Sequence, residues 1–174
     1  MKGLVVLMFL SFGLYAKNPP LDTVKYVEIN KYLGKWYEIA SIPQKFQKGC
    51  TATSANYSLR ADGDIKVVNS CRLGNPKGEL KSAEARGWIK DTETNAKLKV
   101  QFFLTKFKIS FLAGNYWILD LGEDYEYALV GDKSRKYFWI LSRTNKMDEG
   151  LYEELLARAK DMHFDTSQIV KTIH

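Results

Sequence analysis

The chain has 174 residues, of which 45% are hydrophobic, so it is long and apolar enough to bury a sizeable core in one domain. Twenty-six basic residues against 20 acidic ones give a formal net charge of +6. Its two histidines, His163 and His174, both lie near the C-terminus, which argues against histidine-based acid–base catalysis and haem ligation in this chain.

The first sixteen residues, MKGLVVLMFLSFGLYA, are typical of a secretory signal peptide. Lys2 precedes an apolar run that is too short to span a membrane. Cleavage after Ala16 and cleavage after Gly13 both fit, and an uncleaved anchor is the alternative. We expect a signal peptide over 1–16, an extended leader over 17–30 and one domain over 31–174. Because residues 1–16 contain no cysteine, we expect an exported protein that is not N-terminally lipidated.

Eight short runs of β-branched and aromatic residues follow one another between residues 36 and 143, separated by turn residues and polar loops. Neighbouring strands with short connections can pair, and closure of the sheet removes both edges. We therefore predict an all-β fold, an eight-stranded antiparallel up-and-down barrel. The runs are WYEIASI, TATSANYSL, IKVVNSC, SAEARGWI, KLKVQFF, NYWILDL, YEYALVG and YFWILSR.

The hydrophobic period changes after Arg143, where Asp148 can cap a helix. The apolar face of that helix consists of Leu151, Leu155, Ala159 and Met162. One amphipathic helix should therefore pack outside the barrel. A last run, SQIVKTI, can add an edge strand.

Cys50 and Cys71 are the two cysteines of the chain, and an oxidising compartment favours a disulfide between them. If Asp62 and Gly63 form the hairpin turn, Cys71 lies opposite Ser54. The disulfide then requires a bulge in the first strand of the hairpin.

Motifs that carry catalysis are missing: the sequence has no nucleophile elbow, no phosphate-binding glycine loop and no clustered metal ligands. We therefore expect no enzymatic activity, no cofactor and no metal. The basic loops lack a nucleic-acid reading motif, so nucleic acid is not an expected partner.

Three segments resemble the signature regions of the lipocalins in order and spacing: YLGKWYEIA, DYEYALVG at 124–131 and FWILSR at 138–143. The sequence most resembles the branch of bacterial outer-membrane lipocalins and apolipoprotein D. The resemblance implies a barrel open at one end that holds a fatty acid or lysophospholipid for lipid transport or storage. It also implies a location in the periplasm of a Gram-negative bacterium.

The resemblance further implies that Gly34, Trp36 and Arg143 form the closed floor of the barrel. If Trp36 begins the first strand at the floor, alternating strand direction assigns every loop to one end. The loops at the open end then carry ten basic and two acidic residues, and the turns at the closed end carry two basic and eight acidic ones.

This asymmetry predicts a basic rim that orients an anionic or zwitterionic head group outward, or contacts an anionic membrane. The alternative is that these loops are simply solvated. The expected head-group residues are Lys45, Lys48, Lys106, Lys108 and Arg135.

The segment LTKFKISFLAG, residues 104–114, places Phe107, Ile109, Phe111 and Leu112 where exposure is expected. It can fold over the pocket, insert into lipid or form the contact of a weak homodimer. Alternatively, the flanking strands extend through it.

Alternation along the strands, together with the resemblance, predicts which residues line the ligand pocket. The expected ligand contacts are Tyr57, Ala85, Gly87, Leu98, Val100, Phe102, Tyr116, Ile118 and Trp139. We expect a monomer or weak homodimer that binds a small amphipathic lipid. The alternative function is a membrane-docking or protein-interaction module whose barrel is filled by its own side chains.

Overall fold

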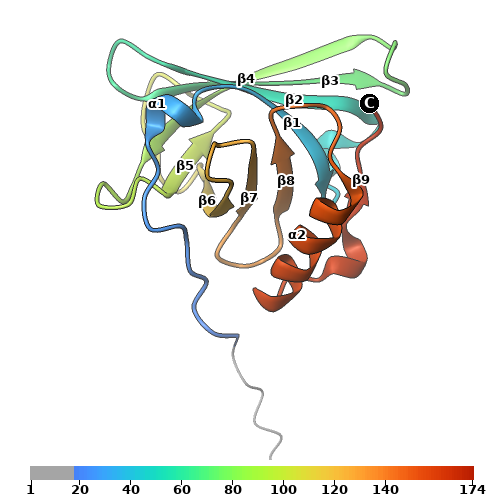
Figure 1. Ribbon diagram of the computed structural model, residues 1–174. Coiled ribbons are helices and arrows are strands. Elements are labelled where there is room, and N and C mark those ends of the chain that lie inside the picture. The colour runs from blue at the N-terminus through green and yellow to red at the C-terminus, as the bar shows by residue number, and fades with distance from the viewer. Residues whose placement is uncertain (1–17) are drawn as a thin grey trace, which may run out of the picture.

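The computed structural model describes residues 18–174, so the predicted signal peptide lies outside the described residues. Eight antiparallel strands form a closed barrel, which confirms the predicted fold class (Figure 1). Each strand pairs with its sequence neighbours, and β1 pairs with both β2 and β8. The strands are β1 (Gly34–Ser41), β2 (Cys50–Leu59), β3 (Ile65–Leu73), β4 (Leu80–Ile89), β5 (Lys97–Gln101), β6 (Gly114–Leu121), β7 (Tyr127–Gly131) and β8 (Phe138–Ser142).

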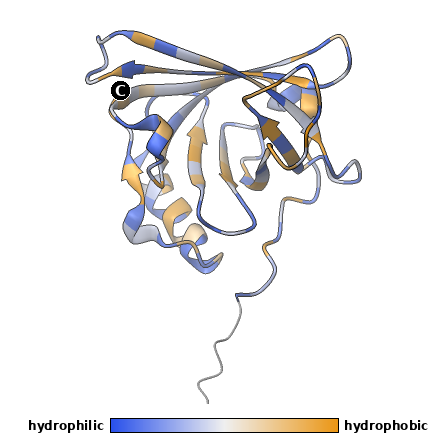
Figure 2. Ribbon diagram, turned by 180° about the vertical axis from the view of Figure 1, so that it is seen from behind, coloured by the Kyte–Doolittle hydropathy of each residue, from blue (hydrophilic) through white to orange (hydrophobic). Residues whose placement is uncertain are grey.

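Alternating hydropathy explains why these segments form barrel strands, and it is visible as bands along the ribbon (Figure 2). In β5, Leu98 is buried inside the barrel, whereas Lys97 and Lys99 are partly exposed. Trp36 of β1 pairs with Ala55 of β2 at the point where the sheet closes. One face of each strand therefore builds the interior.

The C-terminal segment completes the barrel wall where β1 and β2 diverge. These two strands pair only as far as Tyr37 and Ser54. Beyond that point β9 (Val170–Lys171) pairs with β1, and the amide nitrogen of Ala52 in β2 donates to the carbonyl oxygen of Ile173 at 2.6 Å. The expected last strand is therefore present and lies in this seam.

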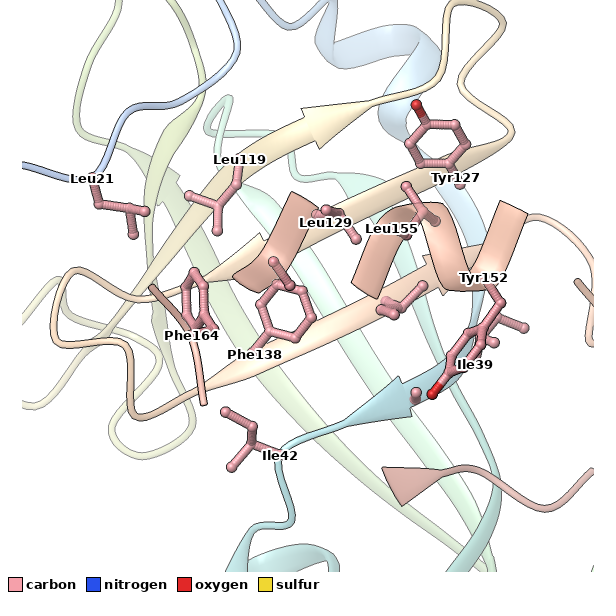
Figure 3. Close-up of a cluster of buried hydrophobic side chains, with 13 residues drawn as sticks. Leu21, Ile39, Ile42, Leu119, Tyr127, Leu129, Phe138, Tyr152, Leu155 and Phe164 are labelled. Carbon is pink, nitrogen blue, oxygen red and sulfur yellow. The ribbon is translucent and has the colours of Figure 1, made fainter. Parts of the chain in front are cut away.

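The predicted helix is confirmed as α2 (Glu149–Asp161), which packs outside the barrel (Figure 1). The Asp148 side chain accepts a hydrogen bond from the Leu151 amide at 3.1 Å and caps its first turn. Leu155 is fully buried against strand residues that include Leu129 and Phe138 (Figure 3). This cluster forms a second core on the outer face of the barrel.

The segment expected as an extended leader is part of the folded unit. The amide nitrogens of Val24 and Val27 donate to the carbonyl oxygens of Ile118 and Thr94 at 3.1 and 2.8 Å, and Val27 is fully buried. The segment ends in one helical turn, α1 (Ile29–Tyr32). These contacts tie the leader to the closed end of the barrel.

Cys50 and Cys71 form the expected disulfide, with 5.4 Å between their Cα atoms. The predicted bulge lies between Thr51 and Ser54 in β2. The predicted register is wrong by one residue, because Ser54 pairs with Ser70 across a five-residue loop, 60–64. The bulge brings the two cysteines together despite this shift.

Candidate ligand-binding site

The closed end of the barrel is sealed by Trp36 and Arg143. Trp36 is fully buried, and the guanidinium carbon of Arg143 lies 3.8 Å from the centroid of its ring. The same guanidinium donates to the carbonyl oxygens of Leu33 at 2.9 Å and Lys35 at 3.0 Å. Gly34 between them has φ of +90°, a conformation that side chains rarely adopt. The residues predicted for the floor therefore lie together.

The half of the barrel above this floor is filled by side chains. Ala85, Leu98 and Ile118 are buried in one cluster with Trp36, and a Cβ atom on Gly87 would lie 3.5 Å from the Cβ of Ile65. These four residues point inward as alternation predicts, but none of them lines the cavity. Their role as ligand contacts stays a prediction, because they are packed among the side chains of the core cluster below the cavity.

A cavity of about 280 Å³ lies in the other half of the barrel and opens at the end opposite the floor. Five predicted contacts line it: Tyr57, Val100, Phe102, Tyr116 and Trp139. Its volume is close to the lower end of the range of small-molecule sites, roughly 300–1,000 Å³. The geometry suits a narrow, mainly apolar ligand.

Glu38 is a buried carboxylate in the cavity wall that the sequence reasoning missed. It accepts hydrogen bonds from Ser41 Oγ at 3.0 Å, Thr172 Oγ1 at 2.8 Å and Gln47 Nε2 at 2.8 Å. Within residues 18–174, the buried Oε1 atom of Gln47 has no hydrogen-bond partner. Alternation could have found Glu38, because it lies two residues after the inward-facing Trp36 on one strand.

Three tyrosine hydroxyls lie at the base of the cavity. Tyr116 Oη is 2.7 Å from Tyr32 Oη and 2.9 Å from Tyr57 Oη. Burial raises the pKa of Tyr57 to about 12, and burial raises the pKa of Tyr32 and Tyr116 well above the usual value for tyrosine. All three hydroxyls are therefore protonated at neutral pH.

The segment between β5 and β6 is a true loop, because the strands end at Gln101 and begin again at Gly114. The alternative that both strands extend through it is therefore wrong. The fully buried side chain of Gln101 holds the loop: its Nε2 donates to the Phe107 carbonyl oxygen at 3.1 Å, and its Oε1 accepts from the Ile109 amide at 2.8 Å. The loop folds back along the outside of the barrel.

Because the loop between β5 and β6 folds back, part of the expected basic rim lies toward the closed end. Lys108 Nζ forms an ion pair with Asp64 Oδ1 at 2.7 Å, and Asp64 belongs to the closed-end loop. Arg86 of β4 bonds both Asp64, at 2.6 Å, and the Lys106 carbonyl oxygen, at 3.3 Å. Lys108 is therefore paired with the loop at the closed end, and its role as a head-group residue stays a prediction.

Arg135 is also not a free head-group ligand. Its Nε donates to the Met162 carbonyl oxygen at 2.7 Å, and its Nη2 donates to the Pro19 carbonyl oxygen at 2.8 Å. The arginine thus connects the end of α2 to the N-terminal segment, and its role as a head-group residue stays a prediction. Of the expected rim residues, Lys45, Lys48 and Lys106 have exposed side chains without an ion-pair partner among residues 18–174, whereas the exposed Lys108 is paired with Asp64.

Residues 18–174 contain no group of three or more histidine, cysteine, aspartate or glutamate side chains that could hold a metal ion. Within the same residues, no helix has the length and apolar character required to cross a membrane.

The sequence model of one protein family, the lipocalin-like domain, matches residues 27–174. The chain belongs to the lipocalin family. Lipocalins are binding proteins for small hydrophobic molecules.

Relatives of this lipocalin occur in plants, bacteria and animals. It is 40% identical over 154 residues to temperature-induced lipocalin-1 of Arabidopsis thaliana, covering 87% of this chain and 82% of that protein. It is 33% identical to the outer membrane lipoprotein Blc of Vibrio cholerae, covering 96% and 94% of the two chains. It is 39% identical to apolipoprotein D of Rattus norvegicus, covering 72% and 65%. The predicted resemblance to the Blc and apolipoprotein D branch is confirmed.

Among solved structures, insecticyanin from the tobacco hornworm Manduca sexta aligns with a TM-score of 0.68 at 18% identity. The alignment covers 91% of this chain and 86% of insecticyanin. At this identity the similarity supports the shared lipocalin fold.

Proposed function

We propose that this lipocalin is an exported carrier or store for a lipid, such as a fatty acid or lysophospholipid, in a bacterial cell envelope. The observation that carries the proposal is the cavity of about 280 Å³, sealed at one end by Trp36 and Arg143. Burial of each methylene in such a cavity stabilises a bound chain by about 0.8 kcal/mol before the entropic cost of binding. Burial of several methylenes therefore offsets the entropic cost of binding.

Exposed lysines near the cavity mouth support the choice of an amphipathic ligand with an anionic or zwitterionic head. Lys45 and Lys48 flank Phe46 and Gln47, and both of these residues line the cavity. A cationic side chain at this position attracts an anionic head group while the apolar chain is buried. The export and envelope location rest on the predicted signal peptide and on the bacterial relatives named outer membrane lipoprotein.

A second candidate function, docking on an anionic membrane, is supported by the loop between β5 and β6. Phe103 is 75% exposed and Phe111 is 86% exposed, and the loop also carries the exposed Lys106. Apolar side chains next to a cation favour an anionic lipid surface. Such docking would place the cavity mouth near membrane lipids. The cavity argues against the other form of this hypothesis, a barrel filled by its own side chains.

Native mass spectrometry and lipid extraction of the purified protein test the main proposal. We expect a reproducible adduct of one lipid per chain, removable by organic extraction and restored by added fatty acid or lysophospholipid. A protein that stays empty against a panel of both lipid classes would contradict the proposal.

A further inference from the structure

The three tyrosines at the base of the cavity come from three separate elements. Tyr32 belongs to α1, Tyr57 to β2 and Tyr116 to β6. Tyr57 and Tyr116 line the cavity, whereas Tyr32 packs beneath them on Trp36 with 5.0 Å between ring centroids. The polar group is thus held between the open cavity and the rigid floor.

The hydrogen bonds of this group leave one donor without an acceptor. Three hydroxyls carry three hydrogens, and the two bonds between them use two of these hydrogens. Within residues 18–174, the three hydroxyls make no hydrogen bonds other than these two. One O–H group therefore lacks a protein acceptor, whichever way the hydrogens are arranged.

A buried hydroxyl hydrogen without an acceptor is unfavourable, so the occupant of the cavity base matters. Water can accept this hydrogen when the cavity is hydrated. A methyl group cannot, so a saturated chain that reaches the base would leave the donor unpaired. An oxygen at the deep end of a ligand would restore the bond.

The charge of that oxygen is constrained by the surroundings. The Arg143 guanidinium lies on the Trp36 ring and donates to four backbone carbonyl oxygens, so its N–H groups are engaged outside the cavity, which Arg143 does not line. The charged side chain that lines the cavity, Glu38, is a carboxylate. A ligand carboxylate at the base would thus be buried without a cation, which is costly. A neutral oxygen fits better.

We propose that the deep end of the cavity binds a neutral oxygen acceptor of the ligand, such as a hydroxyl or carbonyl group, through the hydroxyls of Tyr57 and Tyr116. The preferred ligand is then a lipid that is oxygenated at the end of its chain and not a simple methyl-ended one. The inference rests on the proposed lipid-binding function and names the class of lipid.

Calorimetric titration at neutral pH with dodecanoate and ω-hydroxydodecanoate, and with shorter and longer pairs of the same kind, tests this inference. For the chain length that reaches the base, we expect the wild-type protein to bind the hydroxylated chain at least as tightly as the methyl-ended one. In the double variant Tyr57→Phe with Tyr116→Phe, the hydroxyl would be buried without a partner. The hydroxylated chain should then bind about tenfold more weakly than the methyl-ended chain.

Tyr32→Phe is the control, because it removes one hydroxyl from the group and keeps the two that line the cavity. Tyr57 and Tyr116 then share one hydrogen bond and still leave one free donor. We therefore expect Tyr32→Phe to retain the wild-type ratio of affinities. If the double variant does not fold, the wild-type protein is titrated with a fatty acid that carries a hydroxyl in the middle of its chain. This mid-chain hydroxyl should weaken binding, whereas a terminal hydroxyl should not.

The outcomes separate the two proposals. Tight wild-type binding of methyl-ended chains, with hydroxylated chains rejected equally by wild type and double variant, overturns the oxygen site and leaves lipid binding intact. Equal penalties for mid-chain and terminal hydroxyls overturn it in the same way. Failure of all chains to bind the wild-type protein overturns both proposals.

Discussion

Arg143 and Trp36 stack at the closed end of the barrel, with 3.8 Å between the guanidinium carbon and the centroid of the indole ring system. The guanidinium also donates hydrogen bonds to four backbone carbonyl oxygens, two of them in the segment just before β1 and one in the loop before β7. A single side chain thus joins the N-terminal segment to the end of β8.

Arg143→Ala should lower the free energy of unfolding by about 3 kcal/mol, because the cation–π contact and several charge-assisted hydrogen bonds are lost together. Chemical denaturation measures this change. Arg60→Ala is the matched control at the same end of the barrel, since Arg60 forms only an exposed pair with Asp62 and should contribute less than about 0.5 kcal/mol. Equal stabilities of the two variants would contradict the structural role of Arg143.

The loop between β5 and β6 should depend on Gln101. Replacing Gln101 by Ala removes the bonds to the Phe107 carbonyl oxygen and the Ile109 amide, and it leaves these loop groups without their partner. Amide hydrogen exchange over residues 103–109 should become at least about tenfold faster, because local opening then costs less free energy. Asn56→Ala, at an exposed position of β2, should leave this exchange unchanged. Unaltered protection in the Gln101 variant would show that other contacts hold the loop.

The buried tyrosines predict how stability responds to alkaline pH. The pKa of Tyr57 is about 12 in the folded protein and about 10 when exposed, so the unfolded chain releases this proton first as pH rises. The contribution of Tyr57 to the free energy of unfolding should therefore be constant below about pH 10. It should decrease by up to roughly 3 kcal/mol toward pH 12.

Denaturation of the wild-type protein and of Tyr57→Phe across this pH range measures the effect. The variant should show a shallower decrease, because it has lost one group whose pKa differs between the two states. Parallel curves for the two proteins would mean that Tyr57 ionises in the folded state as easily as in the unfolded one.

Membrane docking makes its own prediction for the exposed loop. Replacing Phe103 and Phe111 by Ser should weaken binding to phosphatidylglycerol vesicles about tenfold or more, because both side chains would leave the lipid. Leu59→Ser is the control, since Leu59 is also exposed but lies at the closed end. Cosedimentation with vesicles compares the variants, and an equal loss in both would point to non-specific adsorption.

Much of the fold was predictable, because strands and helices depend on residue patterns within short segments of the sequence. Alternating hydropathy predicted the eight strands, and a change of period with Asp148 as a cap predicted α2. The lining of the site was harder. Alternation correctly directed Leu98 and Ile118 inward, but their height relative to the cavity depends on strand stagger and on side chains far away in sequence.

Two further features depend on tertiary contacts that no local pattern encodes. Gln101 points out of the barrel, as alternation predicts, yet it is buried because the following loop folds back over it. The positions of Lys108 and Arg135 follow from that loop and from the packing of α2. Loop charges could therefore be counted from the sequence, but their positions could not be assigned.

The central claim is that the cavity above the floor holds the ligand, and filling that cavity tests it most directly. Ala55 lines the cavity, so Ala55→Phe should place a ring in the ligand's space, while Ala61→Phe adds the same ring at an exposed position in the closed-end loop. Circular dichroism would establish that both variants fold, and Ala55→Leu would replace Ala55→Phe if needed. Calorimetric titration with dodecanoate should show at least about a tenfold loss of affinity in the Ala55 variant and none in the Ala61 variant. Wild-type affinity in a folded Ala55 variant would contradict the claim.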